Sequence, residues 1–193
     1  MARYIVRVAN AKKYNRHQVR GVAKEFQDTT RSYEVALKNF RVSEYAVEFD
    51  LFSDDIRSKF AALDAISAVF GNILTERNLG IVEMLQSKEV TVLEAVKLFN
   101  EQRYWECHEI LESIWRIEPD PDEKGAQQGV ILAASLLVHA QKDEDSVCFG
   151  MVVRALAKLS MWRGEKYFSL NISSLKKSLQ DLLETRRIFF PIL

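Results

Sequence analysis

The spacing of apolar residues changes about two-fifths of the way along this chain, and this change constrains the fold more than any other feature. Up to residue 77, four segments alternate apolar and polar residues, and two others repeat apolar residues at helical spacing. Strict alternation indicates strands with one buried face, whereas apolar residues three and four apart indicate amphipathic helices. From residue 81 onward only the helical spacing remains. The chain is therefore predicted to have two parts of different kinds.

The first part is predicted to contain strands at 3–9, 32–38, 43–51 and 72–77, with helices at 15–27 and 54–70. The order strand, helix, strand, strand, helix, strand is that of the split βαβ, or ferredoxin-like, arrangement. The second part is predicted to be a compact bundle of about five helices. We therefore predict an α+β protein, with a ferredoxin-like βαββαβ domain at residues 1–79 and an all-α helical bundle at residues 80–193.

The third predicted strand has two chemically different sides. One side carries Tyr45, Val47, Phe49 and Leu51, and the other carries Glu44, Ala46, Glu48 and Asp50. The apolar side is expected to face the core and the acidic side to be exposed. Carboxylates repel phosphates, so base stacking of RNA on this sheet is disfavoured. We expect these acids to pair with Arg3 and Arg7 on a neighbouring strand.

Charge, cysteines and hydropathy limit the partners and the location of the protein. Lysine plus arginine and aspartate plus glutamate both number 27, which argues against a protein that binds polyanions through its whole surface. Residues 1–24 nevertheless carry seven basic side chains and no acid, and Arg16, Arg20 and Lys24 would share one helix face. A contact with nucleic acid or another anion is left open, beside the plainer interpretation of a solvated helix face.

The two cysteines lie in apolar helical surroundings and are expected to be buried and reduced rather than disulfide-bonded. The start of the chain does not resemble a signal peptide. The longest apolar run, Val130–Val138, is too short to span a bilayer. We expect a cytoplasmic protein without membrane contact, and a homo-oligomer is one possible assembly.

Several local signals outline the predicted bundle. Residues 81–87 are a short helix or linker element. A capping box of Thr91 and Glu94 is expected to open a helix through Asn100, and Asp120 is expected to cap the helix that runs to about Gln141. Asp145 or Ser146, and then Asn171 or Ser173, are expected to open the last two helices. Gly125, Gly129 and Ala133 are four residues apart, so they allow another helix to approach closely. The final segment, IFFPIL, is expected to pack on the core because its side chains would otherwise form an exposed hydrophobic patch.

The most informative segment is the predicted helix at about 104–117, which contains YWECHEILESIWR. At about 100° per residue, Cys107, His108, Leu111, Glu112, Ile114 and Trp115 form one continuous arc, with Trp105 at its edge. Glu106, Glu109, Ser113 and Arg116 fall on the other side. A histidine and a carboxylate thus share an otherwise apolar face, where an unpaired charge is expensive to bury.

Three interpretations of His108 and Glu112 compete. They can fill a polar hole by bonding each other, neighbouring backbone or Arg116, which is the plainest interpretation. They can ligate a metal, since zinc-binding helices also use ligands at i and i+4. They can also form an acid–base pair. A metal needs further ligands, and His139 on the following helix is the best candidate, although a histidine at a helix C-terminus is also favoured by the helix dipole.

The segment FNEQRYWECHEILESIWR (99–116), followed by KGAQQGVILAASLLVHAQ (124–141), resembles a family numbered 309 among the domains of unknown function. Its hallmark, His-x-x-x-Glu-x-x-Trp, is matched by His108, Glu112 and Trp115. The resemblance covers about residues 91–162 and implies a helical domain whose motif has been suggested to bind metal, without an established activity. One departure is that Leu132 stands where the family usually has glutamine.

These observations predict a protein of unknown activity with a polar pocket for a divalent metal ion or a small ligand. His108, Glu112 and His139 are the expected metal ligands, and Trp105, Glu109, Trp115 and Arg116 are the expected ligand contacts. The alternative is a non-catalytic interaction or regulatory module that dimerises through the N-terminal sheet. A metal-dependent hydrolase is a third option. Whether the protein is an enzyme is left open.

Overall fold

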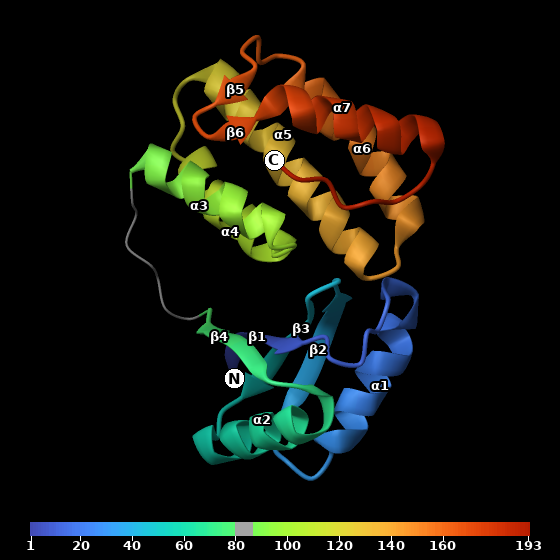
Figure 1. Cartoon of the computed structure of the whole chain (residues 1–193). Helices are drawn as coiled ribbons and strands as arrows, with labels where there is room; N and C mark the ends of the chain where they lie inside the picture. The colour runs from blue at the N-terminus through green and yellow to red at the C-terminus, as the bar shows by residue number, and fades with distance from the viewer. Residues whose placement is uncertain (80–86) are drawn as a thin grey trace. The chain divides into compact units, whose positions relative to one another are not determined.

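The computed structural model describes residues 1–79 and 87–193, and these divide into two compact units. Of the described residues, the first contains 1–79 and 141–143, and the second contains 87–140 and 144–193. Figure 1 shows a sheet with two helices in the first and a group of helices in the second. The chain is thus mixed α/β, as expected. The segment expected at 81–87 as a helix or linker lies almost wholly outside the described residues. Among the described helices, none is long and apolar enough to cross a membrane.

The first unit has the predicted element order. Its elements are β1 (Ala2–Ala9), the 3-10 helix η1 (Arg16–Gln18), α1 (Val19–Thr29), β2 (Ala36–Val42), β3 (Ala46–Ser53), α2 (Ile56–Phe70) and β4 (Ile73–Asn78). The sheet order is β2-β3-β1-β4, and each neighbouring pair is antiparallel. β2 and β4 are therefore the two edge strands.

Two local expectations for this unit were wrong. β2 begins at Ala36 rather than at residue 32, because residues 30–35 turn, with the Tyr33 N–H donating to the Thr30 carbonyl. Arg16 lies in η1 and not in α1, so it does not continue the helical face of Arg20 and Lys24. α2 is capped by Asp55, whose side chain accepts from two backbone N–H groups.

Aromatic side chains fill the core between the sheet and the two helices. Phe26 of α1 stacks on Phe70 of α2 with ring centroids 3.8 Å apart, and Phe49 of β3 meets Phe26 edge-on at 5.5 Å. The predicted inward residues Val47, Phe49 and Leu51 are buried, but Tyr45 is 54% exposed. Tyr45 precedes the first residue of β3, so the alternation of the strand does not apply to it.

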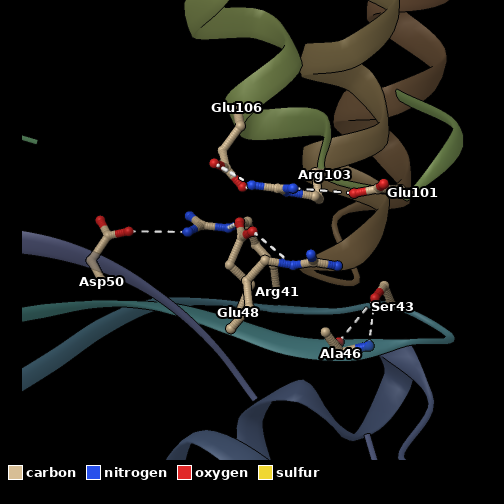
Figure 2. A network of polar contacts seen from close by, with 9 residues as sticks. Arg41, Ser43, Ala46, Glu48, Asp50, Glu101, Arg103 and Glu106 are labelled. Atoms are coloured by element: carbon tan, nitrogen blue, oxygen red, sulfur yellow. Dashed lines mark hydrogen bonds and ion pairs between the residues drawn. The ribbon is translucent and has the colours of Figure 1, made fainter. Parts of the chain in front are cut away.

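The acidic side of β3 is buried rather than exposed. Glu48 and Asp50 flank the guanidinium of Arg41 on β2, with Nε 2.5 Å from Glu48 Oε1 and Nη2 3.0 Å from Asp50 Oδ1 (Figure 2). The expected pairing with β1 is present, because Arg3 bonds Asp50 at 2.8 Å and Arg7 lies 3.7 Å from Glu48. Burial alone would lower the pKa of Arg41, but the two carboxylates outweigh it and hold that pKa above its usual value.

The second unit contains five helices, as predicted, and a short two-stranded ribbon that the sequence pattern did not indicate. Its elements are α3 (Lys88–Asn100), α4 (Tyr104–Trp115), α5 (Pro121–Gln141), α6 (Asp145–Leu159), β5 (Lys166–Tyr167), β6 (Leu170–Asn171) and α7 (Ile172–Thr185). The prediction of an all-α unit was therefore wrong, because the unit also contains this hairpin. Its two strands are too short to show an alternation of apolar and polar residues.

The caps of this unit agree with expectation at two positions and differ at two. The Asp120 side chain accepts from the N–H groups of Asp122 and Glu123, and the Asn171 side chain accepts from Ser174. α3 begins three residues before Thr91, where Ser87 caps it. α6 begins at Asp145, and its N-cap residue is Glu144, which makes no side-chain cap bond.

Small residues on α5 permit the close helix contact that their spacing predicts. A Cβ placed on Gly129 would lie 2.5 Å from Leu159 Cγ of α6, whereas a Cβ on Gly125 would meet Met161 Sδ at 3.7 Å. Around this contact α5 is buried on nearly all sides, and Ala133, Ala134, Leu136 and Leu137 have no exposed surface. α5 is therefore the central helix of the second unit, as predicted (Figure 1).

Candidate functional site

α4 places the predicted site residues at the border of its buried stripe. Tyr104, Cys107, Leu111 and Ile114 are buried in the core of the second unit. His108, Glu112 and Trp115 lie beside that stripe and are half-buried. The polar pair is thus neither enclosed in the core nor free in solvent, since the side chains of His108 and Glu112 keep 24% and 26% of their exposure.

His108 lies between two carboxylates of its own helix. Its Nδ1 is 3.3 Å from Glu109 Oε1, and its Nε2 is 3.7 Å from Glu112 Oε1. The other carboxylate oxygen of Glu112, Oε2, accepts a 2.6 Å bond from Nη2 of Arg116. One ligand atom from each of His108, Glu109 and Glu112 can be chosen so that all three lie within 4.8 Å of one another. Each ring nitrogen of His108 therefore faces a different carboxylate.

The two tryptophans expected near the pair are both half-buried against the core. The indole Nε1 of Trp115 is buried and has no hydrogen-bond acceptor among the described residues. The ammonium of Lys124, in the first turns of α5, lies 5.4 Å from the centre of the Trp115 ring. Trp115, three residues after Glu112 in α4, thus has an indole N–H without an acceptor among the described residues and the ammonium of Lys124 beside its ring.

His139 is not brought into this group. It lies near the end of α5, and its Nδ1 is 2.5 Å from Oε2 of Glu144 in the turn that follows. Among the described residues, the cluster able to hold a metal consists of His108, Glu109 and Glu112. The position of His139 is that of a histidine favoured by a helix C-terminus and a nearby carboxylate. Glu109, expected only as a ligand contact, takes its place in the cluster.

The distances allow one ion to bridge His108 and Glu112. His108 Nε2 and Glu112 Oε1 lie 3.7 Å apart and would be the two atoms to hold such an ion, since imidazole nitrogen and carboxylate oxygen are both ligands of divalent metals. Nδ1 would then carry the ring proton, and this N–H would donate a hydrogen bond to Glu109. A carboxylate in that position fixes the ring orientation and raises the basicity of the ligating nitrogen. Arg116, whose side chain is 69% exposed, forms an ion pair with Glu112.

Two buried polar groups of this unit were missed by the sequence reasoning. Glu106 was expected on the outer side of α4, yet it is 2% exposed and takes two bonds from Arg103, at 2.7 and 2.9 Å (Figure 2). Glu106 lies on the side of α4 whose residues are mostly polar, so the sequence suggested that it is exposed. The one signal of a buried pair was Arg103, three residues earlier.

The second missed group joins α3, the turn before α5, α5 itself and the β5–β6 hairpin. Lys88 Nζ lies 2.6 Å from both Glu118 Oε2 and Glu123 Oε2, and Gln127 donates to Glu118 and to the hydroxyl of Tyr167. Burial alone would raise the pKa of Glu118, but its bonds from Lys88, the Asp120 N–H and Gln127 outweigh burial and lower that pKa. This network closes the unit around the start of α5.

Comparison with known proteins supports the domain resemblance. Residues 92–150 match the model of a family described as a domain of unknown function, DUF309. The match covers α4 and α5 completely, together with most of α3 and the start of α6. Neither the curated proteins nor the solved structures contain a match to this chain. The resemblance predicted from the His-x-x-x-Glu-x-x-Trp motif is thereby confirmed for the C-terminal half.

Proposed function

We propose that the DUF309-like segment binds a divalent transition-metal ion, with His108 Nε2 and Glu112 Oε1 as protein ligands. The observation that carries this proposal is the cluster of three ligand atoms within 4.8 Å on one half-exposed helix face. Glu109 acts as the partner that holds the protonated Nδ1 of His108. This role follows from its 3.3 Å approach to the ring nitrogen on the opposite side from Glu112.

The donor set favours ions that accept nitrogen and oxygen ligands. Zn²⁺, Mn²⁺ and similar ions combine imidazole with carboxylate, whereas a thiolate site would need a cysteine, and Cys107 is fully buried. Two protein ligands leave the remaining coordination positions to water or to a small ligand. The site is thus proposed to hold an exchangeable ion with open positions, and a hydrolase would use one of those positions for water.

Binding is tested by titrating chelator-treated protein with Zn²⁺ and Mn²⁺ in a calorimeter. The wild-type chain should bind one ion, while His108→Ala and Glu112→Gln should each weaken binding at least about tenfold. Glu109→Gln should weaken it less, because its role is indirect. His139→Ala is the matched control, since its side chain contacts Glu144 instead, and it should bind as wild type.

Equal binding by wild type and His108→Ala would contradict the proposal. Loss of binding in His139→Ala would instead restore His139 as a ligand. If neither ion binds, the interaction-module alternative is favoured, and the protein should then be assayed for self-association. Two buried thiols also fit the expected reducing, cytoplasmic location, which fractionation of cells would test.

We further propose that the first unit is ferredoxin-like. Support comes from the βαββαβ element order together with a sheet ordered β2-β3-β1-β4 with antiparallel neighbours. In this order β1 and β2 are parallel to each other and separated by β3, so α1 makes a crossover connection. A solved structure with the same connectivity, superimposed over all four strands, would test the assignment.

A further inference from the structure

The last residues of the chain occupy a specific binding surface on the second unit. We call residues 188–193 the tail, and we call Phe99, Asn100 and Tyr104, at the junction of α3 and α4, the tail-binding surface. The Asn100 side chain makes two bonds with the backbone of Leu193, accepting from its N–H at 2.8 Å and donating to its carbonyl at 3.2 Å. This pair of bonds recognises an extended peptide rather than a particular side chain.

Aromatic contacts give the surface its preference for one tail residue. The ring of Phe190 stacks on Tyr104 with centroids 5.9 Å apart, and Tyr104 meets Phe99 edge-on at 4.9 Å. Phe189, the adjacent residue, points away and is 37% exposed. Two neighbouring phenylalanines therefore have different roles, one facing the surface and one facing solvent.

The tail packs against the core through Ile188, Phe190 and Leu193, and few backbone hydrogen bonds hold it there. Within the part of the chain that the structure describes, Leu193 is the tail residue whose backbone is hydrogen-bonded to the rest of the unit. The tail follows Arg186, which ends α7 in the left-handed conformation, at φ 54° and ψ 26°. A residue with a Cβ is strained there by about 1–2 kcal/mol, and the strain disappears if the connection extends.

We propose that the tail of one copy of this chain binds the tail-binding surface of a second copy, giving a reciprocally exchanged dimer. The second copy carries the one sequence already seen to fit this surface. Extension at Arg186 relieves its left-handed strain, which favours release of the tail from its own copy. The exposed side chains of Phe189 and Ile192, at 37% and 72%, form an outer strip that this exchange does not use. This proposal does not depend on the metal site.

The intramolecular tail competes with exchange, so the dimer is expected at high protein concentration. A short connection keeps the tail at an effective concentration of roughly millimolar, and the dimer fraction should rise as the protein approaches that range. The measurement is light scattering on the full-length chain over roughly 0.01–1 mM, with tryptophan fluorescence confirming that each variant is folded.

Two pairs of variants test the mechanism. Arg186→Val disfavours the left-handed conformation and should strengthen dimerisation at least about tenfold, while Arg186→Gly accepts that conformation and should weaken it. Both lose the contact of Arg186 with the Phe149 ring, so this contact cannot explain a difference between them. Phe190→Ala should abolish the dimer, whereas Phe189→Ala should keep it.

Addition of a free peptide of residues 187–193 should compete with the tail and reduce the dimer of the wild-type chain. A chain that stays monomeric in Arg186→Val would overturn the proposal. So would a dimer that persists in Phe190→Ala and is lost in Phe189→Ala, since that dimer would use the outer strip without exchange.

Discussion

The contact between α5 and α6 leads to a quantitative prediction for two glycines of the same helix. Replacing glycine by alanine in a helix stabilises it by about 0.5–1 kcal/mol, because alanine loses less backbone freedom on folding. Gly125→Ala should show this gain, since its new Cβ would meet Met161 at an ordinary contact distance of 3.7 Å.

Gly129→Ala should behave in the opposite way. Its Cβ would lie 2.5 Å from Leu159 Cγ and 3.1 Å from the Leu159 backbone nitrogen. Carbon atoms pack at about 3.5–4 Å, so α6 would have to withdraw by about 1 Å. Leu159 is fully buried, and overpacking of this kind costs about 1–3 kcal/mol. The gain in helix propensity is common to both variants, so they should differ by the steric cost alone, about 1–3 kcal/mol in the free energy of unfolding.

Urea unfolding followed by tryptophan fluorescence is a suitable assay. All three tryptophans, Trp105, Trp115 and Trp162, lie in the second unit, so the signal reports on that unit without contribution from the sheet. The difference between the variants removes the shared gain in helix propensity and isolates the steric contact. If Gly129→Ala is as stable as Gly125→Ala, the close approach of α5 and α6 is wrong.

Three further outcomes are expected. Because the folded-state pKa of Glu118 is lowered, its contribution to stability is present above its unfolded pKa of about 4.3 and is lost as pH falls through the folded value. Urea midpoints should fall on acidification, and Lys88→Met should reduce that dependence. Asp120→Ala removes two cap bonds and should destabilise the second unit by about 1 kcal/mol in the same assay. Burial raises the pKa of Cys107 and leaves both Cys107 and Cys148 inaccessible, so a thiol reagent should modify neither cysteine before unfolding.

The element order and the cores could be predicted because they depend on local periodicity. The alternation in β3 correctly indicated Val47 and Phe49 as core residues, and the spacing of Gly125 and Gly129 correctly indicated a close helix neighbour. The same reasoning failed where a tertiary partner overrode polarity. Glu48 is buried because Arg41, on the neighbouring strand β2, supplies its charge partner, and the alternation within β3 alone does not reveal that partner.

The candidate site was predictable in part for the same reason. The i, i+4 spacing of His108 and Glu112 fixes their proximity within one helix, so the pair could be recognised in the sequence. The place of Glu109 was harder to foresee, because adjacent residues on a helix point about 100° apart and only long side chains bridge that angle. His139 belongs to another helix, and its distance from α4 depends on tertiary packing that periodicity does not encode.

The charged group on the sheet also determines how β2 and β3 align. Arg41 bonds two carboxylates that lie two residues apart on β3. Asn39, which has a left-handed backbone conformation where the register of β2 shifts, also donates to Asp50. A slip of one residue would turn this guanidinium toward the apolar core on the other face of the sheet and separate it from both acids. A misaligned β2–β3 hairpin would therefore bury a guanidinium without a carboxylate partner. This cost in free energy favours the one alignment in which Arg41 meets both acids.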